Sequence, residues 1–306
     1  MRRKIKKTVL IIGYQCNNNC RFCIDAGKRD LVSKTTVEIK QEMKEAKKRG
    51  TTYLELIGGE TTIRPDAVEL ISFARDLGFK TINMATNGRI LSYPKYAKQI
   101  VEAGLTDIIF SIHGYNAQTH DYLTRAKGSF EQLKKGLANL GKLGFKNIGS
   151  NTTIVKGNYK HLKRIGEFIY DQGIRNSEFI FVDPSCGGAY KNFDEHVPRI
   201  SEAAPYVKKC LEIGKKNGIP HWHIRYVPLC YFTDYLNQVS ELDEVATFQT
   251  EHLAPDFSNF NVESSRREIG RAKTDRCRGC KLFSQCEGVW KEYLKHYGDK
   301  ELIPIK

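Results

Sequence analysis

Three cysteines lie within eight residues near the start of the chain, in the stretch "GYQCNNNCRFCIDAG" at 13–27. Thiolates at Cys16, Cys20 and Cys23 could each bind one iron of a cubic four-iron, four-sulfur cluster and leave the fourth iron without a protein ligand. A structural zinc site would need four protein ligands, usually supplied by two separated C-x2-C pairs. Here Cys20 and Cys23 form one such pair, and Cys16 has no local partner. The spacing therefore favours an iron–sulfur cluster with one open position.

The elements that must position these thiols repeat regularly along the 306 residues. Each apolar, β-rich run ends in polar or glycine-rich residues, which is typical of a buried parallel strand that leads into a functional loop. Strands are expected at 8–14, 53–59, 81–88, 107–114, 147–155 and 178–184. Amphipathic helices are expected at 36–49, 65–77, 93–103, 128–143, 158–172 and 198–217. This alternation predicts a parallel α/β sheet, either doubly wound or curled into a barrel, with the cysteine loop at the active-site edge.

The chain carries a net charge of +14, from 49 Lys and Arg against 35 Asp and Glu. The lysines are spread over helix faces, as in "KQEMKEAKKRG", and form no compact basic patch interleaved with aromatic residues. Nucleic-acid binding is therefore disfavoured. An anionic substrate or an acidic partner remains open.

The composition indicates an ordinary soluble protein with no membrane segment, because no apolar run approaches the roughly 18 residues that a membrane helix needs. The N-terminal apolar stretch at 9–12 is shorter than the ~7–15-residue core of a secretory signal. Nine cysteines, an odd number, are spaced too unevenly for a secreted disulfide framework. We expect a cytoplasmic protein whose clustered cysteines serve metal binding or catalysis.

A second motif, "LIGGETTIRPD", follows the second expected strand. Together with C-x3-C-x2-C after the first strand, and with the aromatic Phe22 before the last cysteine, it makes the sequence resemble the radical S-adenosylmethionine (SAM) superfamily. The resemblance implies a partial (β/α)6 TIM-like barrel, a [4Fe-4S] cluster on Cys16, Cys20 and Cys23, and bound SAM. It also implies that the turn of Gly58, Gly59 and Glu60 receives the amino group of SAM. Glycines would allow close backbone approach to the ligand, and carbonyl and carboxylate oxygens can accept its N–H bonds.

Further SAM-binding residues are implied where the resemblance continues through the later strand ends. Besides Phe22 and the Gly-Gly-Glu turn, they are Asn87, Ser111, Arg125, Asn151 and Thr153. Ser, Asn and Thr at strand ends equally often cap neighbouring backbone as turn residues. His113 and His120 are acid–base candidates. The alternative for His113 is a packed strand-end histidine, and for His120 a solvated histidine at a helix entry.

A second cysteine group, Cys277, Cys280 and Cys286, lies near the end of the chain. It resembles the auxiliary-cluster region of the SPASM and twitch subfamilies. The longer SPASM pattern would have a further cysteine where Trp290 stands, so the resemblance implies a single auxiliary [4Fe-4S] cluster with Cys230 as its fourth ligand. A zinc ion on these cysteines is the alternative.

Cys186 and Cys210 compete with Cys230 as fourth ligand. Cys210 lies among apolar helix residues and is expected to be a small buried side chain. Cys186 follows the last barrel strand, so it could face the substrate as a hydrogen-atom donor or redox thiol; the alternative is an inert loop thiol. The polar stretch 240–275 is expected to be a long loop or cap that helps to close the cavity.

The resemblance implies a radical SAM core at 1–219 and an auxiliary-cluster extension at 220–306. The expected enzyme cleaves SAM reductively, and the 5′-deoxyadenosyl radical takes hydrogen from a small-molecule, cofactor-precursor or peptide substrate. The auxiliary cluster would transfer electrons or bind substrate, and a flavodoxin or ferredoxin would supply electrons. Only fifteen residues precede Cys16, so no N-terminal leader-binding domain is expected. The alternatives are a peptide maturase without such a domain and a non-enzymatic zinc-binding nucleic-acid module.

Overall fold

A computed structural model describes residues 4–306 and contains a nine-stranded sheet in the order β7-β6-β5-β4-β3-β2-β1-β8-β9. Every neighbouring pair is parallel except β8 and β9. The strands are β1 (Ile5–Ile11), β2 (Tyr53–Ile57), β3 (Thr81–Thr86), β4 (Asp107–Ser111), β5 (Ile148–Ile154), β6 (Asn176–Phe181), β7 (His221–Arg225), β8 (Phe248–Leu253) and β9 (Ser258–Asn259). The predicted parallel α/β sheet is confirmed.

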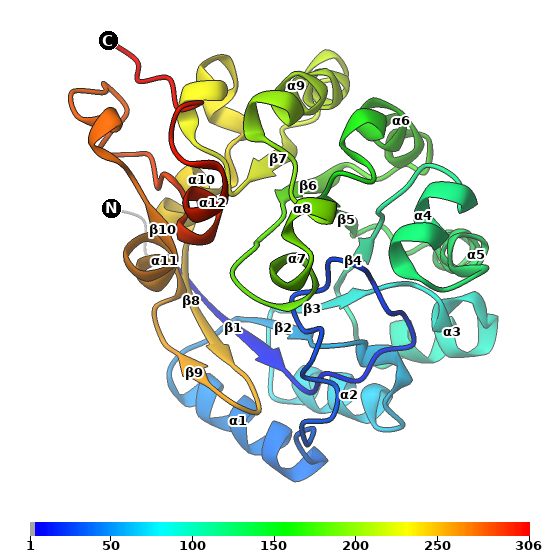
Figure 1. Ribbon diagram of the computed structural model, residues 1–306. Coiled ribbons are helices and arrows are strands. Elements are labelled where there is room, and N and C mark those ends of the chain that lie inside the picture. The colour runs from blue at the N-terminus through cyan, green and yellow to red at the C-terminus, as the bar shows by residue number, and fades with distance from the viewer. Residues whose placement is uncertain (1–3) are drawn as a thin grey trace.

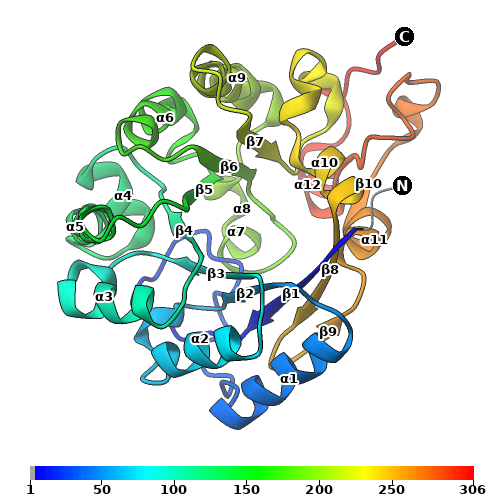
Figure 2. The same ribbon diagram turned by 180° about the vertical axis from the view of Figure 1, so that it is seen from behind.

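The sheet curls into an incomplete barrel with helices on its outer side (Figures 1 and 2). The gap between β7 and β8 is occupied by elements of the C-terminal part, α10 (Ser240–Thr247) and α12 (Lys291–Tyr297) (Figure 1). The outer helices are α1 (Thr36–Lys48), α2 (Ala67–Asp76), α3 (Pro94–Glu102), α4 (Ala117–Thr124), α5 (Ser129–Lys142), α6 (Leu162–Asp171) and α9 (Ile200–Lys216). Short helices α7 (Gly187–Lys191) and α8 (Phe193–His196) follow β6. The partial barrel expected from the resemblance is the architecture of the chain.

The core lies between the strands and the inner faces of these helices. Apolar side chains from both layers are almost fully buried, and burial of this kind is the main stabilising contribution to folding. The buried set includes Leu10, Leu54, Leu56, Ile82, Met84, Ile108, Phe110, Ile165 and Ile169. A capping box at Thr35 and Glu38 begins α1, and Pro94 begins α3, so these helix starts follow from local sequence. No helix among the described residues is long and apolar enough to cross a membrane.

The expectation of a long loop or cap at 240–275 is wrong. This stretch forms α10 (Ser240–Thr247), strands β8 and β9, α11 (Val262–Ser265), a π-helical turn (Arg266–Gly270) and β10 (Arg271–Ala272). Strand β8 pairs in parallel with β1, from Ile5 opposite Phe248 to Leu10 opposite Leu253. Only two of its six side chains are buried, so it lacks the apolar run that predicted β1 to β6.

Strand β10 pairs with β11 (Val289–Trp290), and α12 (Lys291–Tyr297) closes the chain. A buried ionic network fixes these elements to the barrel. The network consists of Arg225, Arg266 and Arg271 with Glu178, Glu241, Glu244 and Glu287. Arg271 is only 2% exposed and pairs with Glu241 at 2.8 Å and with Glu287 at 3.3 Å.

Replacing Arg271 by alanine is expected to lower the free energy of unfolding by about 3–5 kcal/mol, because it leaves buried carboxylates without their partner. The measurement is urea unfolding followed by tryptophan fluorescence, since Trp290 lies 5.7 Å from the guanidinium of Arg271. The control is Arg75→Ala, which removes an exposed pair with Asp76 and should change stability by less than about 1 kcal/mol. Equal effects of the two substitutions would show that the network is not stabilising.

Candidate functional site

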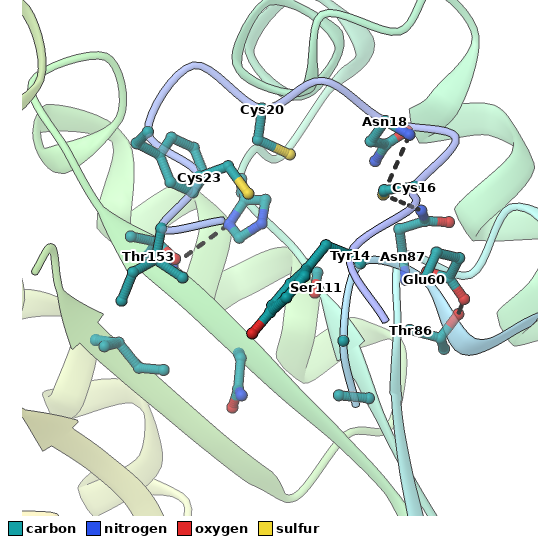
Figure 3. Close-up of a pocket in the computed structure, with 18 of the residues that line it drawn as sticks. Tyr14, Cys16, Asn18, Cys20, Cys23, Glu60, Thr86, Asn87, Ser111 and Thr153 are labelled. Carbon is teal, nitrogen blue, oxygen red and sulfur yellow. Dashed lines mark hydrogen bonds between the residues drawn. The ribbon is translucent and has the colours of Figure 1, made fainter. Parts of the chain in front are cut away.

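The cysteine loop lies at the carboxyl ends of the barrel strands, over a cavity of about 320 Å³. Figure 3 shows the sulfur atoms of Cys20 and Cys23 directed from the loop toward the cavity, with Cys16 on the opposite arm of the loop. Residues from the ends of β1 to β7 complete the lining. They include Tyr14, Phe22, Arg29, Gly58, Gly59, Glu60, Asn87, Ser111, His113, Asn151, Thr153, Ile180, Val182, Asp183 and Tyr226. The cavity therefore lies where parallel barrels place their active sites.

Two arginines hold the backbone of this loop. Arg29 donates to the carbonyl oxygens of Cys16 at 3.5 Å and Asn18 at 2.6 Å, and Arg89 donates to the carbonyl oxygen of Asn17. Asn87 donates through its side chain to the sulfur of Cys16 at 3.7 Å. These contacts place positive charge and N–H donors around a loop that is suited to an anionic cluster.

The thiols fit a cubic cluster by their place around one cavity and by their chemistry. No three His, Cys, Asp or Glu side chains within residues 4–306 converge closely enough to ligate one metal ion. A cubane needs separated thiols, because each cysteine binds a different iron. Burial raises the pKa of Cys16 and raises that of Cys23 to about 11, so both thiols are protonated near neutral pH until a metal displaces the proton.

The glycines of the Gly-Gly-Glu turn serve contact between two loops. The amide of Gly59 donates to the carbonyl oxygen of Gly13 at 2.9 Å, and that of Glu60 donates to Gln15 at 2.8 Å. A Cβ atom at Gly58 would lie 2.3 Å from the oxygen of Gly13, and one at Gly59 would lie 2.0 Å from that of Gln15. Gly58 also has φ +151°, which favours glycine. Because Gly58 and Gly59 have no side chains, the turn can pack directly against the cysteine loop.

Glu60 is 3% exposed and its carboxylate already accepts four hydrogen bonds. The donors are the amide and hydroxyl of Thr62, the hydroxyl of Thr86 and the amide of Asn87. Burial raises the pKa of Glu60, whereas these donors lower it. Glu60 consequently fixes the end of β3 and, through Asn87, the surroundings of Cys16.

The structure brings most of the residues implied to bind SAM to this one cavity. They are Phe22, Gly58, Gly59, Glu60, Asn87, Ser111, Asn151 and Thr153. Arg125 does not line it: this residue is exposed at the C-terminal end of α4, with φ 51°. Cys186 is also exposed and outside the lining, with its sulfur 3.7 Å from the carbonyl oxygen of Ile24.

Both histidine candidates are buried. His113 lines the cavity at 6% exposure, and its Nδ1 accepts the amide of Thr153. Burial, with His120 nearby, lowers the pKa of His113 to about 3, so the ring is neutral and its Nε2–H is available as a donor. The expectation of a solvated His120 is wrong, because this side chain is 0% exposed and packs against Phe130.

Other cavity residues had no sequence motif to reveal them. Arg29 is distant from any apolar run, and its role depends on how the loop folds back over Cys16 and Asn18. Asp183 and Tyr226 each stand just after a strand, at β6 and β7, and that position is the signal that could have identified them.

The four cysteines proposed for the auxiliary cluster line a second cavity, of about 30 Å³. They are Cys230, Cys277, Cys280 and Cys286, and their neighbours are mostly apolar, including Pro228, Leu282 and Ile303. Backbone amides donate to two of the sulfurs: Gly288 to Cys286 at 3.3 Å and Ile305 to Cys280 at 3.4 Å. Burial, with Cys286 and Cys277 nearby, raises the pKa of Cys230 to about 11. Cys210 is instead 0% exposed in the core, as expected for a small buried side chain.

Comparison with known proteins identifies the family. The model of the Radical SAM superfamily matches residues 10–169, just over half of the chain. The chain belongs to the Radical SAM superfamily. This membership confirms the prediction of an enzyme of that superfamily and implies an iron–sulfur cluster and SAM, for which the first cavity has suitable residues.

Two curated relatives and one solved structure illustrate the similarity. The chain is 32% identical over 175 residues to the AdoMet-dependent heme synthase of Methanosarcina barkeri, covering 56% of this chain but only 49% of that enzyme. It is 25% identical to a probable GTP 3′,8-cyclase of Sulfurisphaera tokodaii, covering 78% and 75% of the two chains. Streptococcus suis SuiB bound to S-adenosylmethionine has a TM-score of 0.69 at 15% identity, covering 95% of this chain and 74% of SuiB. At that identity the likeness to SuiB supports the fold alone.

Gly59→Ala is expected to destabilise the radical SAM protein by about 1–3 kcal/mol or more, because the added methyl group overlaps the backbone of Gln15. The matched control is Gly141→Ala in α5, where a Cβ meets nothing within 4 Å. That change should raise stability by about 0.5–1 kcal/mol through helix propensity. Thermal unfolding of both variants measures the difference. A Gly59→Ala variant as stable as the wild type would contradict the loop contact described above.

Proposed function

We propose that this protein is a radical SAM enzyme whose cluster is held by Cys16, Cys20 and Cys23. The supporting observation is that these thiols and the Gly58–Gly59 turn border one cavity, and that the amides of Gly59 and Glu60 donate to the carbonyl oxygens of Gly13 and Gln15, just before Cys16. When bound, the cluster would supply an electron to SAM, and the resulting 5′-deoxyadenosyl radical would take a hydrogen atom from the substrate.

The chain's own residues place the ligands and exclude competing hydrogen donors. Arg29 and Arg89 hold the loop carbonyls, and Glu60 holds Asn87 beside Cys16. The neutral His113 offers an N–H donor without carrying an ionic charge into the cavity. The strand ends at Ser111, Asn151 and Thr153 supply further polar groups for the cofactor. Arg125 is exposed at the end of α4 and is not among the residues proposed to bind SAM.

We also propose that Cys230, Cys277, Cys280 and Cys286 hold one auxiliary [4Fe-4S] cluster. Their common cavity is small and apolar, and amide donors to thiolate sulfur are typical surroundings of a bound cluster. This cluster would transfer electrons or bind substrate. The domain division at 219 and 220 stays a prediction, as do a flavodoxin or ferredoxin donor and a cytoplasmic location.

The substrate class is proposed as a small molecule, a cofactor precursor or a peptide. The heme synthase and the probable GTP cyclase are named for small-molecule reactions, and SuiB was also solved bound to its precursor peptide SuiA. A peptide maturase is therefore the second candidate.

Anaerobic reconstitution with iron and sulfide is expected to give brown protein with about eight irons per chain. Reduction in the presence of SAM should then yield 5′-deoxyadenosine and methionine. Cys20→Ala should lower the iron content to about four and abolish 5′-deoxyadenosine, since one corner of the first cluster loses its ligand. The control is Cys210→Ala, which lies in the core and should retain iron and activity. Absence of 5′-deoxyadenosine from fully loaded wild-type protein would contradict the proposed reaction.

Cys277→Ala is expected to lose about four irons and to keep the spectroscopic change that SAM causes at the first cluster. The readouts are iron content and electron paramagnetic resonance of the reduced protein with and without SAM. Cys230→Ala should give the same result, whereas Cys186→Ala should retain all the iron. About one zinc per chain in place of four irons would show that the second cavity is a structural zinc site.

A further inference from the structure

The half of the main cavity formed by β6 and β7 has no cofactor-binding assignment. The proposed cluster and SAM residues come from the ends of β1 to β5. Ile180, Val182 and Asp183 follow along β6 and its end, and Tyr226 follows β7. These four side chains are therefore open to a ligand bound beside SAM. The inference below rests on the proposed function and concerns the substrate of that same cavity.

Asp183 is the charged side chain of the lining that retains a free acceptor. Arg29 donates to loop carbonyls, and the Glu60 carboxylate accepts four hydrogen bonds. One oxygen of Asp183, Oδ1, accepts the amide of Ser185 at 2.8 Å and its hydroxyl. The second oxygen has no hydrogen-bond or ion-pair partner within residues 4–306. Asp183 is half-buried, so this oxygen is open to a hydrogen-bond donor of a ligand in the cavity.

The surroundings of Asp183 leave it without a neutralising cation of the protein. Arg271 is the positive charge that acts on it, but this arginine is paired with Glu241 and Glu287. Lys28 and Asp25 act on Cys186 at the rim together with Asp183, but Lys28 forms its ion pair with Asp256.

Tyr226 supplies an aromatic wall to the same half of the cavity. Its backbone is held at φ 68°, an unusual conformation for a residue with a side chain, by a hydrogen bond from its amide to Glu241. Its ring packs edge-on against Trp290 at 4.9 Å. The guanidinium groups of Arg225 and Arg266 already lie over this ring, at 5.5 Å and 5.9 Å from its centre, so Tyr226 contributes a wall rather than a cation site. Ile180 and Val182 offer an apolar surface to an aliphatic stem.

We propose that Asp183 binds a cationic group of the substrate, a primary ammonium or a guanidinium, whose aliphatic stem lies along Ile180 and Val182. The ion pair would hold the substrate at a fixed distance from SAM, so that one C–H bond faces the reactive carbon. The cation could belong to a free amine or to a lysine or arginine side chain of a peptide.

The test is calorimetric titration of the reconstituted, SAM-loaded protein with matched probes. Agmatine and cadaverine represent free cations, and 1-pentanol is their neutral counterpart. The peptide acetyl-Gly-Lys-Gly-amide represents a bound side chain, with its Nε-acetylated form as the neutral control. Binding of the amines alone would assign a small-molecule source, and tighter binding of the lysine peptide would assign a peptide source.

Asp183→Asn should weaken cation binding at least about tenfold, because the charge is lost while its Oδ1 can still accept from Ser185. Asp171→Asn, at the exposed end of α6, removes the same charge elsewhere and should bind as the wild type does. The SAM affinity of each variant shows whether it is folded. If Asp183→Asn does not fold, Asp183→Ser is used in its place.

The inference is overturned if the Asp183 variants bind the cations as the wild type does, if the neutral probes bind equally well, or if neither cation binds. These results are separate from the proposed function, which is measured as 5′-deoxyadenosine from SAM. If the wild-type protein cleaves SAM but binds no cation, the cation-binding inference is contradicted and the proposed function stands. If the protein binds cations but does not cleave SAM, the proposed function is contradicted and cation binding stands.

Discussion

Hydrogen bonds that continue the β1–β2 pairing past the ends of both strands hold the whole site together. Beyond Ile11 opposite Ile57, the amides of Ile12, Gly59 and Glu60 bond in turn to Ile57, Gly13 and Gln15. This extended pairing fixes the cysteine loop to the turn that carries Glu60, and Glu60 then fixes the end of β3. A side chain on either glycine would separate the two loops, so the pair of glycines is a requirement of backbone packing before any ligand binds.

The sequence allowed the barrel to be predicted where strands are buried on both faces, as continuous apolar runs reveal them. The expected runs at 53–59 and 147–155 correspond to β2 and β5. Strand β8 could not be recognised in this way. Its place is set by backbone pairing with β1 and by polar contacts, such as the hydrogen bond from Thr8 to Glu251 at 2.6 Å. Pairing between segments about 240 residues apart leaves no local sequence pattern.

The site was predictable to the extent that its residues are fixed by short-range spacing. Cys16, Cys20 and Cys23 had to share a loop, and the Gly-Gly-Glu turn had to follow the next strand, so both reach one edge of the sheet. Arg125 illustrates the limit: it is close in sequence to cavity residues, but a left-handed turn at the end of α4 leaves it exposed. Asp183 and Tyr226 become neighbours of one cavity only through the curvature of the sheet, which spacing alone does not encode.

The segment after β7 joins the two cysteine sites. Tyr226 lines the main cavity, and Cys230, four residues later, lines the second one. Trp290 contacts the ring of Tyr226. It lies on β11, which begins three residues after Cys286 and pairs with β10. The ring of Tyr226 also lies 5.9 Å from the guanidinium of Arg266, which pairs with Glu287, the residue next to Cys286. The C-terminal part thus forms one wall of the proposed substrate site as well as a cysteine site of its own. Removing a cysteine from the second cavity should therefore alter the packing around Tyr226.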